Sequence, residues 1–150
     1  MSGKSLRALA LGLLARREHT RAQLASRLAP LAGEGEDLEA LLDEFVASGF
    51  LSDERFAEQF VRRRRGRQGP LRIGQELRAR GVDEAGVGAA LRDARASEAR
   101  EALALLRRKY PVPPASADER ARQGRFLQNR GFSLAAIRRV LDLPADEDTG

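Results

Sequence analysis

Four consecutive arginines, Arg62 to Arg65, form the densest cluster of charged side chains in the chain, and Arg67 and Arg72 follow closely. A guanidinium group presents a planar set of N–H donors that pairs bidentately with a phosphate or a carboxylate. Between residues 55 and 82, nine arginines stand against two glutamates, a net charge of +7. This density indicates a polyanion or an acidic protein face as partner. Consecutive helical residues point to different sides, so two or three of the run can face one partner.

The candidate contact residues for a partner or for DNA are eight arginines: Arg62, Arg63, Arg64, Arg65, Arg67, Arg72, Arg80 and Arg130. A second explanation fits the run itself, because cations in the last turn of a helix complement the helix dipole and aid solubility. The acids are segregated too, with six carboxylates and no cation from Glu34 to Glu44. This uneven distribution, more than the overall charge of +5, favours contact with an anionic partner.

Other chemistry finds little support in the sequence. Cysteine is absent, and the single histidine, His19, is interpreted as part of a polar turn without partners, so no metal site is expected. Asp53 and Glu54 are interpreted as acids of a first helical turn rather than catalytic carboxylates. The usual phosphate-binding loop is missing, so any nucleotide dependence should belong to a partner. We expect a non-enzymatic protein with no catalytic residues, no metal and no cofactor.

The elements that must carry these arginines are helices, because apolar residues recur at helical spacing and no stretch alternates like a strand. The string Leu77-Arg-Ala-Arg-Gly81-Val82 returns 50 residues later as Leu127-Gln-Asn-Arg-Gly131-Phe132. A fixed period of this kind is typical of repeat proteins, whose units pack against their neighbours. We predict an all-α fold of three tandem three-helix repeats, resembling helix-turn-helix units without a wing. Residues 1–51, 52–96 and 97–150 would form an elongated protein that can curve.

Local signals place the helix boundaries within each repeat, where long, short and medium helices are expected in that order. Ser97 is predicted to cap the first helix of the third repeat. Gly81 and Gly131 occupy the position after a helix end, where a left-handed conformation stops the helix. Residues 110–114 are predicted to be a stiff proline-rich linker, and residues 142–150 an acidic, frayed tail.

The longest apolar run, Ala8 to Ala15, is too short to span a bilayer and fits a helix better than a signal peptide. We therefore expect a cytoplasmic protein without membrane contact, and a monomer. An elongated helical surface suits another macromolecule better than a metabolite.

Three strings occur in a fixed order along the chain. They run from Gly49-Phe-Leu-Ser-Asp-Glu-Arg-Phe to Ala57, from Gly69-Pro-Leu-Arg-Ile-Gly-Gln-Glu to Val82, and from Phe126-Leu-Gln-Asn-Arg-Gly-Phe to Ser133. Together, within three repeats, they resemble the RecX family, the bacterial modulators of the RecA recombinase, over about residues 5 to 142. Two positions depart from the family pattern: Asn129 replaces a frequent basic residue, and Phe56 stands where tyrosine is common.

The resemblance implies a non-catalytic protein that binds RecA, mainly as a filament on single-stranded DNA. It implies inhibition of strand exchange, of ATP hydrolysis by RecA and of its coprotease role in the SOS response. Two mechanisms stay open, since such a protein could lie along the filament groove and bridge subunits or could cap the growing end.

A second hypothesis is a nonspecific nucleic-acid-binding repeat protein, since three-helix units resemble helix-turn-helix domains. The segment Ala85-Gly-Val-Gly-Ala89 is poorly equipped to read bases, which leaves direct but nonspecific phosphate contact, weakened by salt. The third hypothesis, less favoured than the other two, is a structural adaptor unrelated to DNA.

The arginine run generates a first prediction. Reversing charge with Arg63→Glu and Arg64→Glu should weaken partner binding without unfolding the protein, because it removes two guanidinium groups that would pair with an anionic partner. Binding measured at low salt tests this, with circular dichroism as the check on folding. An unchanged affinity would contradict it.

Overall fold

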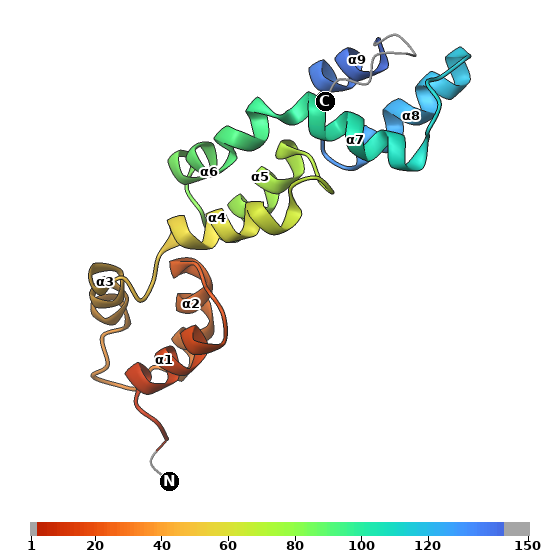
Figure 1. The fold of residues 1–150 in the computed structure, drawn as a ribbon. Coiled ribbons are helices and arrows are strands. Elements are labelled where there is room, and N and C mark those ends of the chain that lie inside the picture. The colour runs from red at the N-terminus through yellow and green to blue at the C-terminus, as the bar shows by residue number, and fades with distance from the viewer. Residues whose placement is uncertain (1–2, 143–150) are drawn as a thin grey trace.

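In this computed structural model, which describes residues 3–142, three groups of helices follow one another along an elongated molecule (Figure 1). Each group encloses its own cluster of buried apolar side chains, and we call the groups the first, second and third module. Within the described residues the secondary structure is helical, and Arg65 and Gln68 form an isolated bridge rather than a strand. The all-α prediction and the elongated arrangement are confirmed.

The first module contains α1 (Leu6–Arg16), α2 (Arg21–Leu28), the short 3-10 helix η1 (Ala29–Leu31) and α3 (Leu38–Ser48). A capping box begins α2, in which Thr20 Oγ1 accepts from the Gln23 amide and the Gln23 side chain accepts from the Thr20 amide. The buried cluster is built mainly from leucines: Leu6, Ala10, Leu24, Leu28, Leu42, Phe45 and Leu51.

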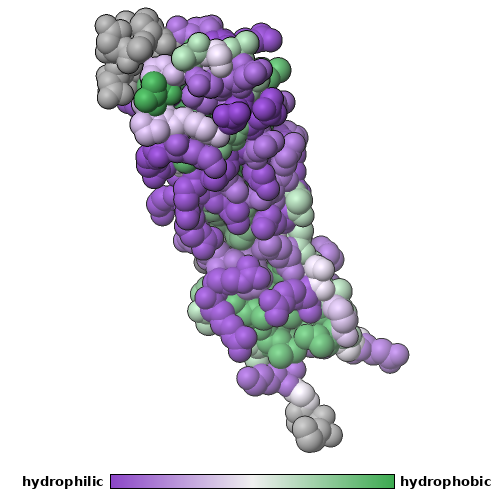
Figure 2. All heavy atoms as spheres, turned by 90° about the vertical axis from the view of Figure 1, so that its right-hand side faces the viewer, coloured by the Kyte–Doolittle hydropathy of each residue, from purple (hydrophilic) through white to green (hydrophobic). Residues whose placement is uncertain are grey.

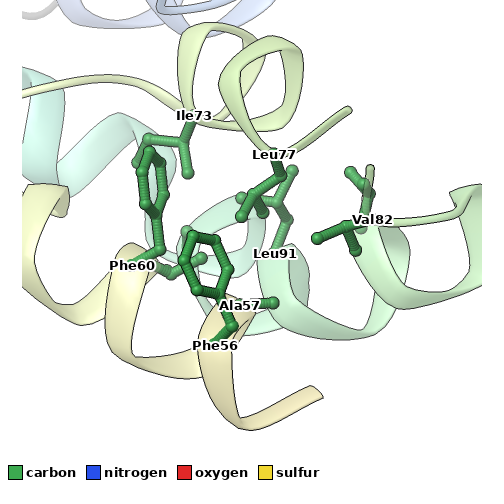
Figure 3. Packing of buried hydrophobic residues seen from close by; sticks show 10 residues of the cluster. Phe56, Ala57, Phe60, Ile73, Leu77, Val82 and Leu91 are labelled. Atoms are coloured by element: carbon green, nitrogen blue, oxygen red, sulfur yellow. The ribbon is translucent and has the colours of Figure 1, made fainter. Parts of the chain in front are cut away.

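The second module contains α4 (Asp53–Arg64), α5 (Pro70–Ala79) and α6 (Glu84–Ala96). The Ser52 hydroxyl accepts from the Arg55 amide and caps α4, which therefore begins with acids and ends with the arginine run. Figure 3 shows the buried side chains of the three helices meeting in one cluster. Burial of these apolar side chains fixes which face of α4 points outward. It therefore also fixes which of the arginines of α4 lie at the surface.

The third module contains α7 (Glu98–Lys109), α8 (Ala117–Asn129) and α9 (Leu134–Leu141). The expected order of helix lengths is wrong here, because α8 has 13 residues and α9 only 8, and it is wrong in the second module too, where α6 with 13 residues is longer than α4 with 12. A Ser116 cap and two acids in the first turn start α8 earlier than its apolar residues alone indicate. The predicted capping by Ser97 is also wrong: its hydroxyl accepts from Arg100 Nη2 instead, because α6 passes almost directly into α7.

The repeated glycines end the middle helices as expected. Gly81 and Gly131 have φ values of +94° and +89°. After Gly81, the Val82 amide donates to the Leu77 carbonyl oxygen at 3.1 Å. After Gly131, the Phe132 amide donates to the Leu127 carbonyl oxygen at 3.2 Å. This pattern is the Schellman motif.

The same two glycine turns join the modules end to end. Thr20 Oγ1, at the start of α2, donates to the carbonyl oxygen of Arg80, at the end of α5, over 2.5 Å. The Gly69 amide, at the start of α5, donates to the carbonyl oxygen of Arg130, at the end of α8, over 2.7 Å. A carbonyl that a helix end leaves unsatisfied is thus bonded across each module boundary, by a side-chain hydroxyl at the first and by a backbone amide at the second.

Close approach at these junctions requires glycine for a second reason. A Cβ atom built on Gly81 would overlap that of Ala22, and a Cβ atom built on Gly131 would overlap that of Arg72. The sequence echo therefore encodes both a helix end and a module contact.

His19 is the main local correction, since it was expected in a polar turn and is instead only 2% exposed. Its Nδ1 lies 3.0 Å from the carbonyl oxygen of Arg17, beside the Thr20 junction. Burial at a module boundary depends on residues far away in sequence, which a local reading misses.

The predicted divisions after residues 51 and 96 stay predictions, which the three separate clusters support. Residues 110–114 carry no helix, in line with the expected linker. Residues 143–150 of the predicted acidic tail lie outside the described residues. Among the helices described, none has the length and apolar character needed to cross a membrane.

The junction geometry predicts unequal costs for two glycine substitutions. Gly131→Ala should lower the free energy of unfolding by about 2–4 kcal/mol, from left-handed strain plus overlap with Arg72. Gly49→Ala is the matched control, because its φ is +84° but a Cβ would meet open space, leaving about 1 kcal/mol of strain. Urea unfolding measures both, and equal losses would contradict the junction role.

Burial lowers the pKa of His19 below its ordinary value of 6.5. The unfolded chain therefore takes up a proton near that pH while the folded chain stays neutral. The free energy of unfolding should be full above pH 6.5 and fall below it, by at most about 1.4 kcal/mol per pH unit. Urea unfolding between pH 7.5 and about 5.5 should show this slope, and His19→Gln should remove it. The same slope in both proteins would refute the assignment.

Candidate functional site

A groove lined by arginines lies on the second module and is completed by residues of both neighbours. Its volume is about 610 Å³. Its lining is Arg17, Phe56, Phe60, Arg63, Arg64, Arg67, Gln68, Arg80 and Arg130. Six guanidinium groups therefore gather in one place, and among the described residues no carboxylate lines the groove.

The two module junctions supply equivalent pairs of these arginines. Arg17 follows the first helix of its module and Arg67 follows the first helix of the next, 50 residues later. Arg80 and Arg130, also 50 residues apart, are the C-caps of α5 and α8. The repeat thus supplies one pair of arginines from each junction, and α4 adds Arg63 and Arg64.

A buried aromatic ring orients two of the central arginines. The Phe60 ring is 3% exposed, and the Cζ atoms of Arg64 and Arg80 lie 4.1 and 4.8 Å from its centroid. The ring attracts each cation and so holds both guanidinium groups next to Phe60. Arg80 Nη1 also donates to the Glu76 carbonyl oxygen at 3.0 Å.

Backbone carbonyls hold the arginines of the second junction. Arg130 Nη1 donates to the Arg67 carbonyl oxygen at 3.3 Å, and its Cζ lies 5.1 Å from the ring centroid of Phe126. Arg67 Nη2 in turn donates to the Arg63 carbonyl oxygen. These partners are neutral, so they fix the side chains without cancelling their charge.

Arg64 is the exception, because its Nη1 forms an ion pair with Glu76 at 3.0 Å. Within residues 3–142, the other five groove arginines form no ion pair: Arg17, Arg63, Arg67, Arg80 and Arg130. An array of fixed cations suits a ligand with several phosphates or carboxylates, each paired with one or two guanidinium groups.

Three of the predicted contact residues lie outside the groove lining. Arg65 serves the junction with the third module, where its Nε donates to Glu101 at 2.7 Å. Arg72 donates to the Asn129 carbonyl oxygen at 2.9 Å across the same junction. Arg62 is exposed on α4.

Sequence reasoning missed Arg17 as a groove residue. A signal for it existed, because the 50-residue offset that relates Arg80 to Arg130 also relates Arg17 to Arg67. The expected metal-free character rests on the sequence. In the described part of the chain no three histidine, cysteine, aspartate or glutamate side chains gather as metal ligands would.

Comparison with known proteins gives consistent matches. A family model described as the second three-helix domain of RecX matches residues 52–91, and one described as the third three-helix domain matches residues 97–141. Regulatory protein RecX of Herbaspirillum seropedicae is 48% identical over 96% of this chain and 94% of the relative. Regulatory protein RecX of Chromobacterium violaceum is 49% identical over 97% and 95%.

The fold matches as well. The crystal structure of RecX from Lactobacillus salivarius aligns with a TM-score of 0.80 at 21% identity, over 93% of this chain and 96% of that one. Together with the two family models and the identity of the relatives, this shows that the chain belongs to the RecX family.

Proposed function

We propose that this protein binds the RecA recombinase, or its filament on single-stranded DNA, and inhibits its ATPase, strand-exchange and coprotease activities. Its relatives are named regulatory protein RecX, which supports a regulatory role. The proposal places that role in the cytoplasm, in DNA repair, recombination and the SOS response. The protein needs no cofactor for this role and acts as a monomer.

One observation carries the proposal: all three modules contribute arginines to one groove without a lining carboxylate. A surface assembled from three modules can contact an extended anionic partner along its length. Four of the six guanidinium groups are already held by rings or carbonyls, so these side chains lose little freedom on binding: Arg64, Arg67, Arg80 and Arg130.

The elongated shape favours bridging over end capping as the mechanism. A protein that spans neighbouring subunits of a filament hinders the motions that accompany hydrolysis and strand exchange. The rigid junctions at Gly81 and Gly131 would transmit that restraint. Filament length at sub-stoichiometric protein separates the two mechanisms, because growth arrest by few copies favours capping.

Direct nonspecific nucleic-acid binding is the second candidate, because guanidinium groups pair with phosphates. The groove rings do not support base stacking, since Phe56 and Phe60 are each 3% exposed. Contact with DNA would therefore run through the backbone and weaken steeply with salt.

The test uses Arg63→Glu with Arg67→Glu, which avoids the Arg64–Glu76 ion pair. This double substitution should raise the protein concentration needed to half-inhibit ATP hydrolysis by RecA on single-stranded DNA. The expected increase is roughly tenfold or more, a change of about 1.4 kcal/mol. Wild-type protein should inhibit in a dose-dependent way.

The matched control is Arg138→Glu with Arg139→Glu, two exposed cations in the last turn of α9. It changes net charge equally and should leave inhibition within about twofold. An equal loss of inhibition in both double variants would mean that net charge alone accounts for the effect. No inhibition by the wild type, with salt-sensitive binding to bare DNA, would move the assignment to the second candidate.

A further inference from the structure

The outward face of α1 carries no charge over more than two turns. No charged residue stands between Arg7 and Arg16, and four exposed residues of this stretch are apolar or glycine: Ala8, Leu11, Gly12 and Ala15. A helix at a protein surface normally presents polar side chains to water. Figure 2 shows apolar atoms gathered on the first module, whereas the surface above it in that view is mainly hydrophilic.

A groove of about 220 Å³ lies at one edge of this face, where Ala8 and Gly12 belong to both, and Arg27 of α2 and Leu31 of η1 complete its lining. Leu9, Leu13 and Leu31 line it together with the small residues Ala8 and Gly12. Leu31 is 55% exposed. The groove thus offers apolar walls that an inserted side chain can contact. In the structure the leucine side chain there is exposed to solvent.

Gly12 is unexplained by packing inside the chain. A Cβ atom at this position would meet nothing within 4 Å. Glycine within a helix costs about 1 kcal/mol relative to alanine, and Gly12 has no positive φ that would require it. Its missing side chain leaves the groove open to the backbone of a partner.

The charged residues of the groove are all cations: Lys4, Arg16 and Arg27. None of them forms an ion pair within the described range. Arg27 also lines a neighbouring groove with Arg17 and Arg80, and those two belong to the arginine groove. The apolar groove is therefore continuous with the basic surface.

We propose that the groove between α1 and η1 docks an amphipathic protein segment with apolar anchor residues and acidic flanks. Leucines receive the anchors, and the cations pair with the flanking carboxylates. This site adds recognition of protein to the anion binding proposed above, and it stands on its own residues.

Two other occupants fit less well. A second copy of the chain would bring the same cations against each other in a two-fold contact, which repels. A membrane surface accepts a projecting apolar ridge, whereas this feature is a groove that receives side chains.

The experiment uses the full chain and a labelled 16-residue helical peptide with leucines on one face and glutamates elsewhere. Fluorescence anisotropy should show saturable binding, and the same peptide with lysines should not bind. Gly12→Glu should weaken binding roughly tenfold or more by filling the groove and reversing its charge. Gly88→Glu is the matched control, because it is also a helical glycine whose Cβ meets open space, and it should stay within about twofold.

Amide chemical shifts on titration should move in α1 and η1. The proposal is overturned by no saturable binding, by equal loss in both glycine variants, or by shifts confined to the arginine groove. It is also overturned if Gly12→Glu abolishes only binding to phosphatidylglycerol vesicles or only self-association. Inhibition of RecA lost in Arg63→Glu with Arg67→Glu while peptide binding persists would separate this site from the proposed function.

Discussion

The contact on which the structure depends is the meeting of helix ends at Gly81 and Gly131. Each turn ends a middle helix, turns its last carbonyl toward the first residues of the preceding middle helix, and packs without a Cβ atom. Backbone groups that a helix end leaves unsatisfied are thereby bonded. Because one partner in each contact is a backbone carbonyl, bonded by the Thr20 hydroxyl at the first junction and by the Gly69 amide at the second, neighbouring modules are held in a defined relation rather than linked loosely.

This arrangement explains why the arginines converge. The C-caps of α5 and α8 are arginines, so the residues that close each junction also carry a cation to the groove edge. Arg64 and Arg80 share the Phe60 ring, and Arg130 bonds the backbone of Arg67. Three modules with small separate cores thus produce one continuous surface that no module could form alone.

Local sequence predicted much of this and failed where distant residues decide. The echo around Gly81 and Gly131 predicted the repeat, and Asp53 and Glu54 predicted the first turn of α4, because helix-end signals and periodicity are local properties. Burial of His19 and the role of Arg65 at a junction depend on module packing, which no short string contains. Only two members of the arginine run, Arg63 and Arg64, line the groove, as the helical geometry of consecutive residues requires.

Photo-crosslinking tests most directly whether the groove is the face that meets the recombinase filament. A photoreactive benzoylphenylalanine can be placed at position 67 or at position 139, one at a time. Position 67 lines the groove, and position 139 is exposed on α9 away from its lining. We expect crosslinks to RecA or to its DNA strand from position 67 and not from position 139. Crosslinks of equal yield from position 139, or none from position 67, would contradict it.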